Sequence, residues 1–205
     1  MTDRPLQPIG AIEVHGMTRS AFILRGALGA GAIYGAGAAG PLVSRAFAQE
    51  GGDVEILNFA LMLQYLEEDF YRQGLALGLA GDVKTLATAF RGHEEAHIET
   101  LTKAVTGAGA TPVKKPTFEF PIEDQGSFVT LGMTLEDTGV MAFNGAGPKL
   151  ISNEALDGAG MIVQVEARHA AALRLAAMQE PAPKAFDETI EMKDVLEAVE
   201  PFIKT

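Results

Sequence analysis

The sequence predicts an all-α protein, a bundle of four amphipathic helices followed by one short helix. Four long segments repeat apolar residues every three or four positions, which is the spacing of an amphipathic helix. Residues 107–126, with three prolines, separate the second segment from the third. This connection is too long for a simple helix hairpin and suits a crossover along a bundle. Strand-like alternation is limited to a weak pattern in TFEFPI.

Length and composition limit the class of protein. The 205 residues suffice for one domain with a full core. The chain has no cysteine, which excludes disulfides, thiolate metal sites and cysteine nucleophiles. The net charge of −11 argues against a nucleic-acid partner, because the chain has no basic excess to displace counterions from phosphates.

The first 48 residues differ in composition from the rest and predict an export signal. A short basic region precedes an uncharged run at residues 26–44, and Ala46-Phe47-Ala48 then matches the small-x-small pattern that signal peptidases cut. We therefore expect residues 49–205 to form the mature domain in the periplasm or another extracytoplasmic space. The alternative is that residues 21–43 are retained as a membrane anchor.

Start and stop signals predict the boundaries of the first two helices. The first begins after Asp53 as its N-cap and ends at Gly78 and Gly81. The second begins after Asp82, again as N-cap, and stops at Gly107.

The remaining helices follow the crossover. The third begins near Ser127 and continues to Gly147-Pro148. The fourth runs from near Asn153 to Pro181. After a polar stretch, DVLEAVEPFI predicts a short helix packed on the outside of the bundle.

Each bundle helix carries a glutamate within its apolar stripe, and the second and fourth helices add a histidine one turn later. Steps of three and four residues keep these side chains on the same face as their apolar neighbours. A carboxylate on such a face is forced into the core, where its desolvation is costly unless a cation compensates. The candidate metal ligands are Glu67, Glu94, His97, Glu136, Glu166 and His169.

These candidates form an internal repeat. Glu67 precedes Glu94-x-x-His97 by 27 residues, and Glu136 precedes Glu166-x-x-His169 by 30. Each half is therefore a helix hairpin that supplies one Glu, then a Glu and a His one turn apart. Two such hairpins related by a pseudo-twofold axis would surround two metal ions. Imidazole nitrogens with carboxylate oxygens suit iron or manganese and disfavour soft metals.

The stretch from His93 to His97 also reads H-E-x-x-H, the pattern of a zinc protease helix. That hypothesis needs a third ligand downstream, and Glu99 is the only candidate and lies too close. We interpret His93 as a residue beside the site or at the surface. A solvated Glu–His pair on a helix surface is a further alternative, but two copies, each after an apolar-stripe glutamate, argue against it.

Several segments resemble one family. LEDTGVMAFNGAGPKL and ILNFALMLQYLEEDFY, with VEARHAAALR and TPVKKPTFEF, are similar to the exported ferritin-like domain proteins, which include desiccation- and stress-related members. The resemblance covers residues 53–204 and implies a ferritin-like four-helix bundle with a di-metal site at the six candidate positions. The first helix departs from the family, in which LExLE often stands in place of residues 63–67. If the ligand position is that of Gln64, the site loses one carboxylate, and Glu68 is a further alternative to Glu67.

The preferred function is a di-iron or di-manganese oxidoreductase that acts on Fe(II), oxygen or peroxide in stress protection. Tyr71 could donate a hydrogen bond or an electron near the site, or serve only as a core residue. The alternative is a structural or interaction subunit with an empty site, membrane-associated if its N-terminal segment is retained. Metal ions and small oxidants are thus the expected partners, and assembly into a homo-oligomer stays open.

Overall fold

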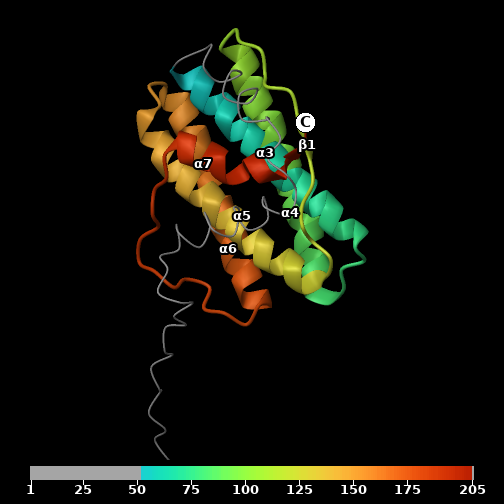
Figure 1. Cartoon of the computed structure of the whole chain (residues 1–205). Helices are drawn as coiled ribbons and strands as arrows, with labels where there is room; N and C mark the ends of the chain where they lie inside the picture. The colour runs from blue at the N-terminus through green and yellow to red at the C-terminus, as the bar shows by residue number, and fades with distance from the viewer. Residues whose placement is uncertain (1–51, 205) are drawn as a thin grey trace, which may run out of the picture.

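Four long helices form the bundle in the computed structural model, which describes residues 52–204 (Figure 1). They are α3 (Asp53–Ala76), α4 (Gly81–Gly107), α5 (Gln125–Ala146) and α6 (Asn153–Ala176). α3 packs chiefly against α4, and α5 against α6, so the bundle consists of two hairpins that meet through α3–α5 and α4–α6 contacts. The predicted all-α bundle is confirmed. The export signal or anchor predicted in residues 1–48 lies outside the described residues.

Two glycines with a left-handed backbone mark the boundary between α3 and α4, as predicted. The predicted N-caps of the two helices are wrong. Gly78 and Gly81 have φ of 80° and 56°, a left-handed backbone that glycine adopts without strain. Gly78 lies between the two helices, and Gly81 is the first residue of α4. Asp53 and Asp82 are not N-caps. Both lie in the first turn of their helices, where a negative charge still interacts favourably with the helix dipole.

The Asp53 carboxylate instead joins the two hairpins. Its oxygens accept hydrogen bonds from the backbone amides of Ile151 and Ser152, each at 2.7 Å. Ser152 is itself the N-cap of α6, accepting from the Ala155 amide at 3.2 Å. The start of α3 is therefore tied to the start of α6.

α5 begins two residues before the predicted Ser127 because of a capping box. The Asp124 carboxylate accepts from the Ser127 amide at 2.8 Å, while the Ser127 hydroxyl oxygen accepts from the Asp124 amide at 3.0 Å. Two otherwise orphaned amides at the helix start are thereby paired.

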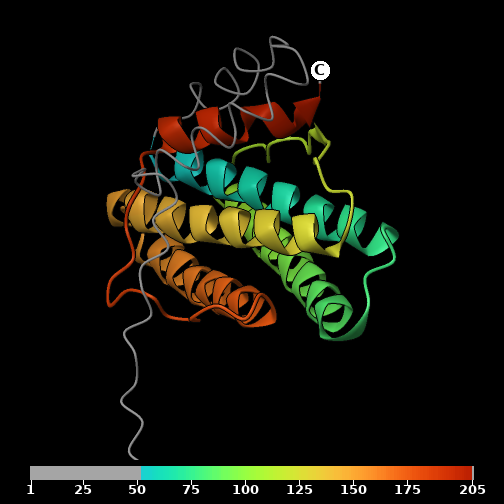
Figure 2. The same ribbon diagram turned by 60° about the horizontal axis from the view of Figure 1, so that its bottom comes forward.

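The connection between α4 and α5 runs along the bundle, as predicted (Figure 1). Within it β1 (Thr117–Phe118) pairs antiparallel with β2 (Ile203–Lys204) near the C-terminus. α7 (Met192–Val199) lies outside the four long helices (Figure 2) and buries an apolar face that includes Val195 and Val199. Short 3₁₀ turns, Gly147–Lys149 and Glu200–Phe202, follow α5 and α7.

Aromatic packing joins the C-terminal half of α3 to the start of α5. The rings of Phe70 and Phe128 stack with their centroids 4.7 Å apart. A Cβ atom at Gly74 would lie 2.1 Å from the Phe128 ring, so this position of α3 requires glycine.

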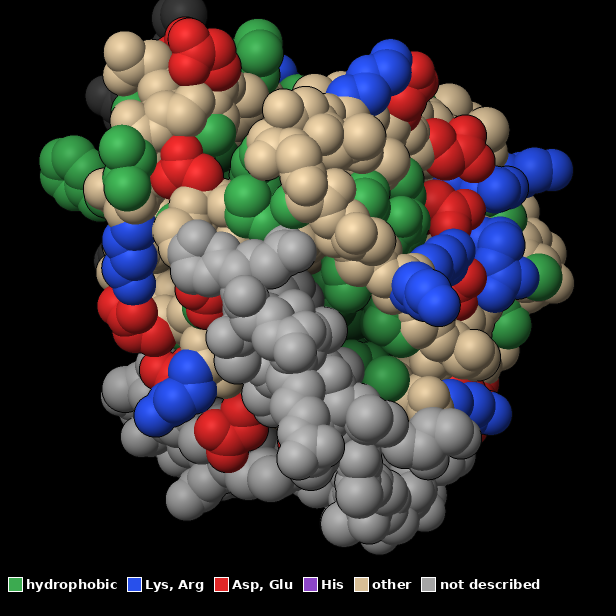
Figure 3. Space-filling view, turned by 90° about the horizontal axis from the view of Figure 1, so that it is seen from above, with side chains coloured by type: hydrophobic (Ala, Val, Ile, Leu, Met, Phe, Trp, Pro, Cys, Tyr) green, Lys and Arg blue, Asp and Glu red, His purple; other side chains and the backbone are tan. Residues whose placement is uncertain are grey.

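Seen from above, acidic and basic side chains lie intermixed around hydrophobic ones (Figure 3). Within residues 52–204, none of the helices has the length and apolar character needed to cross a membrane.

Candidate metal centre

Six ionisable side chains from the four long helices meet in the middle of the bundle. Every one of the four glutamates is at most 2% exposed, and one histidine is buried while the other is partly buried. The structure thus brings together all the residues predicted as metal ligands: Glu67, Glu94, His97, Glu136, Glu166 and His169.

The best-formed part of this cluster surrounds His169. Its Nδ1 atom lies 3.1 Å from Glu94 Oε1, 3.4 Å from Glu136 Oε1 and 3.3 Å from Glu166 Oε2. One ligand atom from each of these four residues lies within 4.8 Å of the other three. The geometry can therefore hold a cation among three carboxylates and an imidazole.

Four polar atoms in this region are buried without a hydrogen-bond partner in the described part of the chain. They are Glu94 Oε1, Glu136 Oε2, Glu166 Oε2 and His169 Nδ1. An unsatisfied buried polar group costs about 1–3 kcal/mol, more when charged. A divalent cation would satisfy all four, and oxygen with imidazole nitrogen is a donor set that iron and manganese accept. The residues present therefore fit a metal.

His97 forms the second part of the cluster. Its Nδ1 atom lies 3.0 Å from Glu94 Oε2 and 3.3 Å from Glu166 Oε1. Glu94 and Glu166 therefore each face His97 with one carboxylate oxygen and His169 with the other. This arrangement suits carboxylates that bridge two metal positions.

Helix α3 contributes two neighbouring side chains. Gln64 is fully buried, and its Oε1 atom lies 2.6 Å from His97 Nδ1. Its Nε2 group donates to Glu67 Oε2 at 2.7 Å and to Glu166 Oε1 at 3.1 Å. Of the alternatives that the sequence left open, both Glu67 and Gln64 lie in the cluster.

Glu68 lies outside the cluster, although it too is buried. Its carboxylate oxygens pair with Arg91 at 3.0 Å and with Lys115 at 2.5 Å. Because Lys115 belongs to the crossover, this glutamate attaches the crossover to the first hairpin rather than facing the metal position.

Two further residues contact the ligands. Tyr71 is fully buried, and its hydroxyl donates a hydrogen bond to Glu136 Oε1. His93 is exposed, and its Nδ1 atom lies 2.9 Å from His169 Nε2, with the two rings stacked. The Nε2 atom of His169 faces away from the carboxylates, so His93 lies beside the site, as the sequence suggested, and outside the carboxylate cluster.

The carboxylates raise the pKa of both histidines. Burial lowers the pKa of His169, but its contacts with Glu136, Glu166 and Glu94 outweigh burial and raise it to about 12. Burial also lowers the pKa of His97, and Glu166 and Glu94 raise it to about 9. Both imidazoles therefore hold protons in the metal-free protein, and a metal ion must displace them.

The pKa values of buried glutamates in the cluster shift in different directions. Burial raises the pKa of Glu136 to about 8, although His169 opposes this shift. Burial, and then repulsion from the other buried carboxylates, raises the pKa of Glu67 well above its ordinary value. Burial also acts to raise the pKa of Glu166, but its close contacts with the His169 and His97 imidazoles lower it to about 2. The cluster thus shares protons that a cation could replace.

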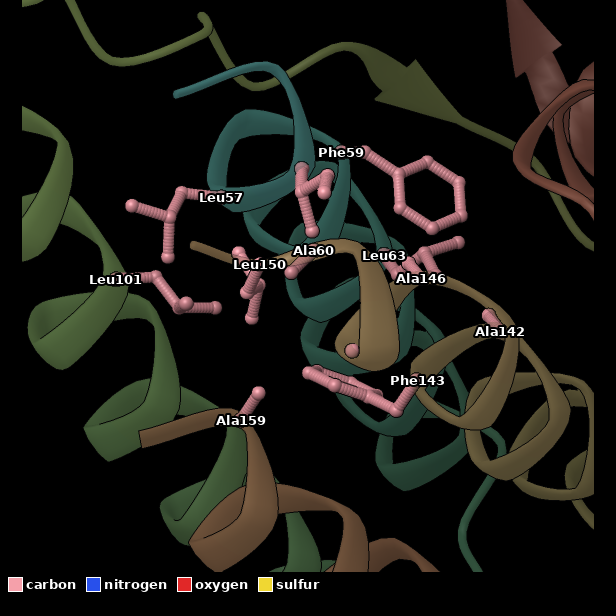
Figure 4. A pocket seen from close by; sticks show the side chains of 12 residues that line it. Leu57, Phe59, Ala60, Leu63, Leu101, Ala142, Phe143, Ala146, Leu150 and Ala159 are labelled. Carbon is pink, nitrogen blue, oxygen red and sulfur yellow. The ribbon is translucent and has the colours of Figure 1, made fainter. Parts of the chain in front are cut away.

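A small apolar cavity lies within the bundle towards the end where α3 begins (Figure 4). Leu63, which precedes Gln64, and Phe143, two turns beyond Glu136, both line it. The cavity is enclosed from other sides by Leu57 and Ala60 of α3, Leu101 of α4 and Ala159 of α6. The cavity is therefore enclosed by apolar side chains.

Comparison with known proteins agrees with this architecture. A family model described as a ferritin-like domain matches residues 52–179, a range that contains all six candidate ligands. The crystal structure of a conserved hypothetical protein from Mycobacterium tuberculosis is similar, with a TM-score of 0.57 and 16% sequence identity over 65% of this chain and 96% of that chain. At this identity the similarity shows a common fold alone. A comparison with curated proteins finds no significant match.

Proposed function

The chain belongs to the ferritin-like domain family, and from this premise we propose that it binds two iron or manganese ions and reduces dioxygen or peroxide with them. Glu136 and His169 would hold one ion, His97 and the α3 side chains the other, and Glu94 and Glu166 would lie between the two. When bound, such ions would supply one electron each, so that two Fe(II) and two protons would convert hydrogen peroxide into two waters, or dioxygen into hydrogen peroxide, and leave two Fe(III).

One observation carries the proposal. Three carboxylate oxygens and one imidazole nitrogen, from Glu94, Glu136, Glu166 and His169, are buried at one point without hydrogen-bond partners among the described residues. A core that served only for packing would gain stability by pairing these atoms or by replacing them with apolar groups. A bound cation gives the arrangement a chemical use.

Tyr71 is the residue best placed to serve the reaction itself. Burial, and then the neighbouring Glu136 carboxylate, raise the pKa of its hydroxyl well above its ordinary value. The hydroxyl therefore stays protonated at neutral pH and holds its proton at Glu136 Oε1. It can therefore position this carboxylate.

Metal analysis tests the proposal. The full chain is purified, its Fe and Mn contents are measured, and the metal-free protein is reloaded anaerobically with Fe(II) or Mn(II). We expect about two ions per chain, and oxidation of bound Fe(II) by dioxygen or peroxide faster than that of free Fe(II). Glu136→Gln, which keeps the shape but removes the charge, should lower both metal content and oxidation rate. A folded protein that takes up neither metal would support the alternative, a structural or interaction subunit.

A further inference from the structure

The two hairpins are related by one constant offset in sequence. Adding 72 to a residue number takes Glu94 to Glu166 and His97 to His169. The same offset takes Gln64, not Glu67, to Glu136. The separation of Gln64 from Glu94 is 30 residues, equal to that of Glu136 from Glu166.

The contacts in the cluster follow the same relation. Gln64 Oε1 lies 2.6 Å from His97 Nδ1, and Glu136 Oε1 lies 3.4 Å from His169 Nδ1. Each of these side chains therefore contacts the histidine of its own hairpin through the same ring nitrogen. Gln64 thus occupies the place in the first hairpin that Glu136 occupies in the second.

Glu67 breaks the symmetry, and the structure shows what accommodates it. The offset takes Glu67 to Gly139, which has no side chain. A Cβ atom at Gly139 would lie 2.8 Å from Glu67 Oε1, so a larger residue there would displace the Glu67 carboxylate from its present position. The first hairpin therefore presents a neutral amide at the symmetric ligand position and its carboxylate one helical turn further along.

We propose that Gln64 makes the two metal positions unequal, an inference that rests on the proposed function. The His169 position has the Glu136 carboxylate and binds a divalent cation tightly. The His97 position has the Gln64 amide, whose oxygen carries no charge and whose Nε2 hydrogens already bind Glu67 and Glu166. Those hydrogens compete with a cation for the carboxylate oxygens, so the His97 position binds more weakly.

Titration of the metal-free full chain with Mn(II) under anaerobic conditions tests this inference. Calorimetry gives the two affinities, and electron paramagnetic resonance counts free Mn(II) and detects coupled pairs of ions. The wild type should bind one Mn(II) tightly and a second roughly 10- to 100-fold more weakly, the range by which supporting residues alter metal affinity. Gln64→Glu should strengthen the second step until the two affinities are similar.

Two further variants complete the design. Glu136→Gln makes the second hairpin resemble the first, and it should abolish the tight step and leave only weak binding. Glu68→Gln is the matched control, because it removes a buried charge from the same helix outside the cluster and should keep one tight and one weak step. Circular dichroism of each variant confirms that it is folded.

The outcomes separate this inference from the proposed function. Equal affinities in the wild type, or a second step that Gln64→Glu leaves unchanged, would overturn the inequality while the metal site stands. A tight step that survives Glu136→Gln would also overturn it. If neither the folded wild type nor any variant binds Mn(II) or Fe(II), the proposed function fails and this inference fails with it.

Discussion

Of His93, His97 and His169, the last two are candidate metal ligands, and the first lies beside them. His97 and His169 direct Nδ1 at Glu94 and Glu166, at distances from 3.0 to 3.3 Å. His93 is exposed, and its Nδ1 atom contacts the far nitrogen of the His169 ring, Nε2. Two of the three histidines therefore meet the carboxylates from inside the bundle, and the third supports one of them from outside.

This difference predicts the effect of removing each histidine. His97→Ala and His169→Ala should each reduce metal content strongly, because each removes an imidazole nitrogen that faces the carboxylates. His93→Ala should keep most of the metal, with at most a roughly 10- to 100-fold loss of affinity, the cost of removing a partner that supports a ligand. Elemental analysis of the three purified variants makes the comparison. Equal loss in all three would revive the zinc hypothesis for H-E-x-x-H.

At the level of single residues, the sequence predicted all six clustered side chains and left Gln64 open as an alternative ligand position. A glutamate in an apolar stripe is costly to bury, and this cost identified Glu94, Glu136 and Glu166. A neutral amide in such a stripe carries no comparable signal, since it can pair with a neighbour anywhere in a core. The constant offset of 72 residues between Gln64 and Glu136 is the sequence signal that could have favoured this alternative.

At the level of elements, the periodicity of apolar residues located the helices. Contacts between residues distant in sequence fix the remaining features, which periodicity does not predict. The Asp53 carboxylate binds amides at Ile151 and Ser152, and no local rule connects residues so distant in sequence. β1 and β2 are strands of two residues each, too short to show alternation. They exist because the crossover and the C-terminus meet beside the bundle.

The crossover gives a prediction at this scale. Glu68 holds Lys115 at 2.5 Å and Arg91 at 3.0 Å, and so fastens the crossover to α3 and α4. Glu68→Ala should lower the free energy of unfolding by about 1–3 kcal/mol, because it removes the acceptor of two charged hydrogen bonds. It should also speed proteolysis within residues 108–124, while metal content stays at the wild-type level.

Urea unfolding, timed proteolysis and metal analysis of one preparation check all three effects. Glu67→Ala is the informative comparison, since it removes the adjacent carboxylate that faces the cluster. It should lower metal content and leave the crossover protected. If instead Glu68→Ala loses metal and Glu67→Ala keeps it, the assignment of Glu67 to the site is wrong.

At the level of the whole molecule, the N-terminal segment carries a separate prediction. The small-x-small pattern Ala46-Phe47-Ala48 follows an uncharged run, which is typical of a cleaved export signal. N-terminal sequencing of the protein from its native source should therefore begin at Gln49. A membrane-bound protein that begins at Met1 or Met17 would instead indicate a retained anchor.

Protons and a bound metal ion would compete for the same cluster, and we expect this competition to change the stability of the bundle. In the metal-free protein the pKa of Glu136 is raised to about 8 and that of His97 to about 9. A group whose pKa is higher in the folded state stabilises it fully below the unfolded pKa and loses this effect as the pH rises through the folded pKa. Glu166, with a pKa lowered to about 2, loses its contribution only in acid.

We therefore predict that the metal-free protein loses stability as the pH rises from about 4.5, the ordinary carboxyl value, to about 9. Metal binding should strengthen over the same interval, because the protons that the ion must displace are held less firmly. The free energy of unfolding of the metal-loaded form should then exceed that of the metal-free form by about 2.7 kcal/mol when the free metal concentration is a hundredfold above its dissociation constant. Thermal midpoints of both forms across this interval should diverge as the pH rises. A gap that stays constant or narrows would show that the histidines and carboxylates of the cluster do not take up the metal.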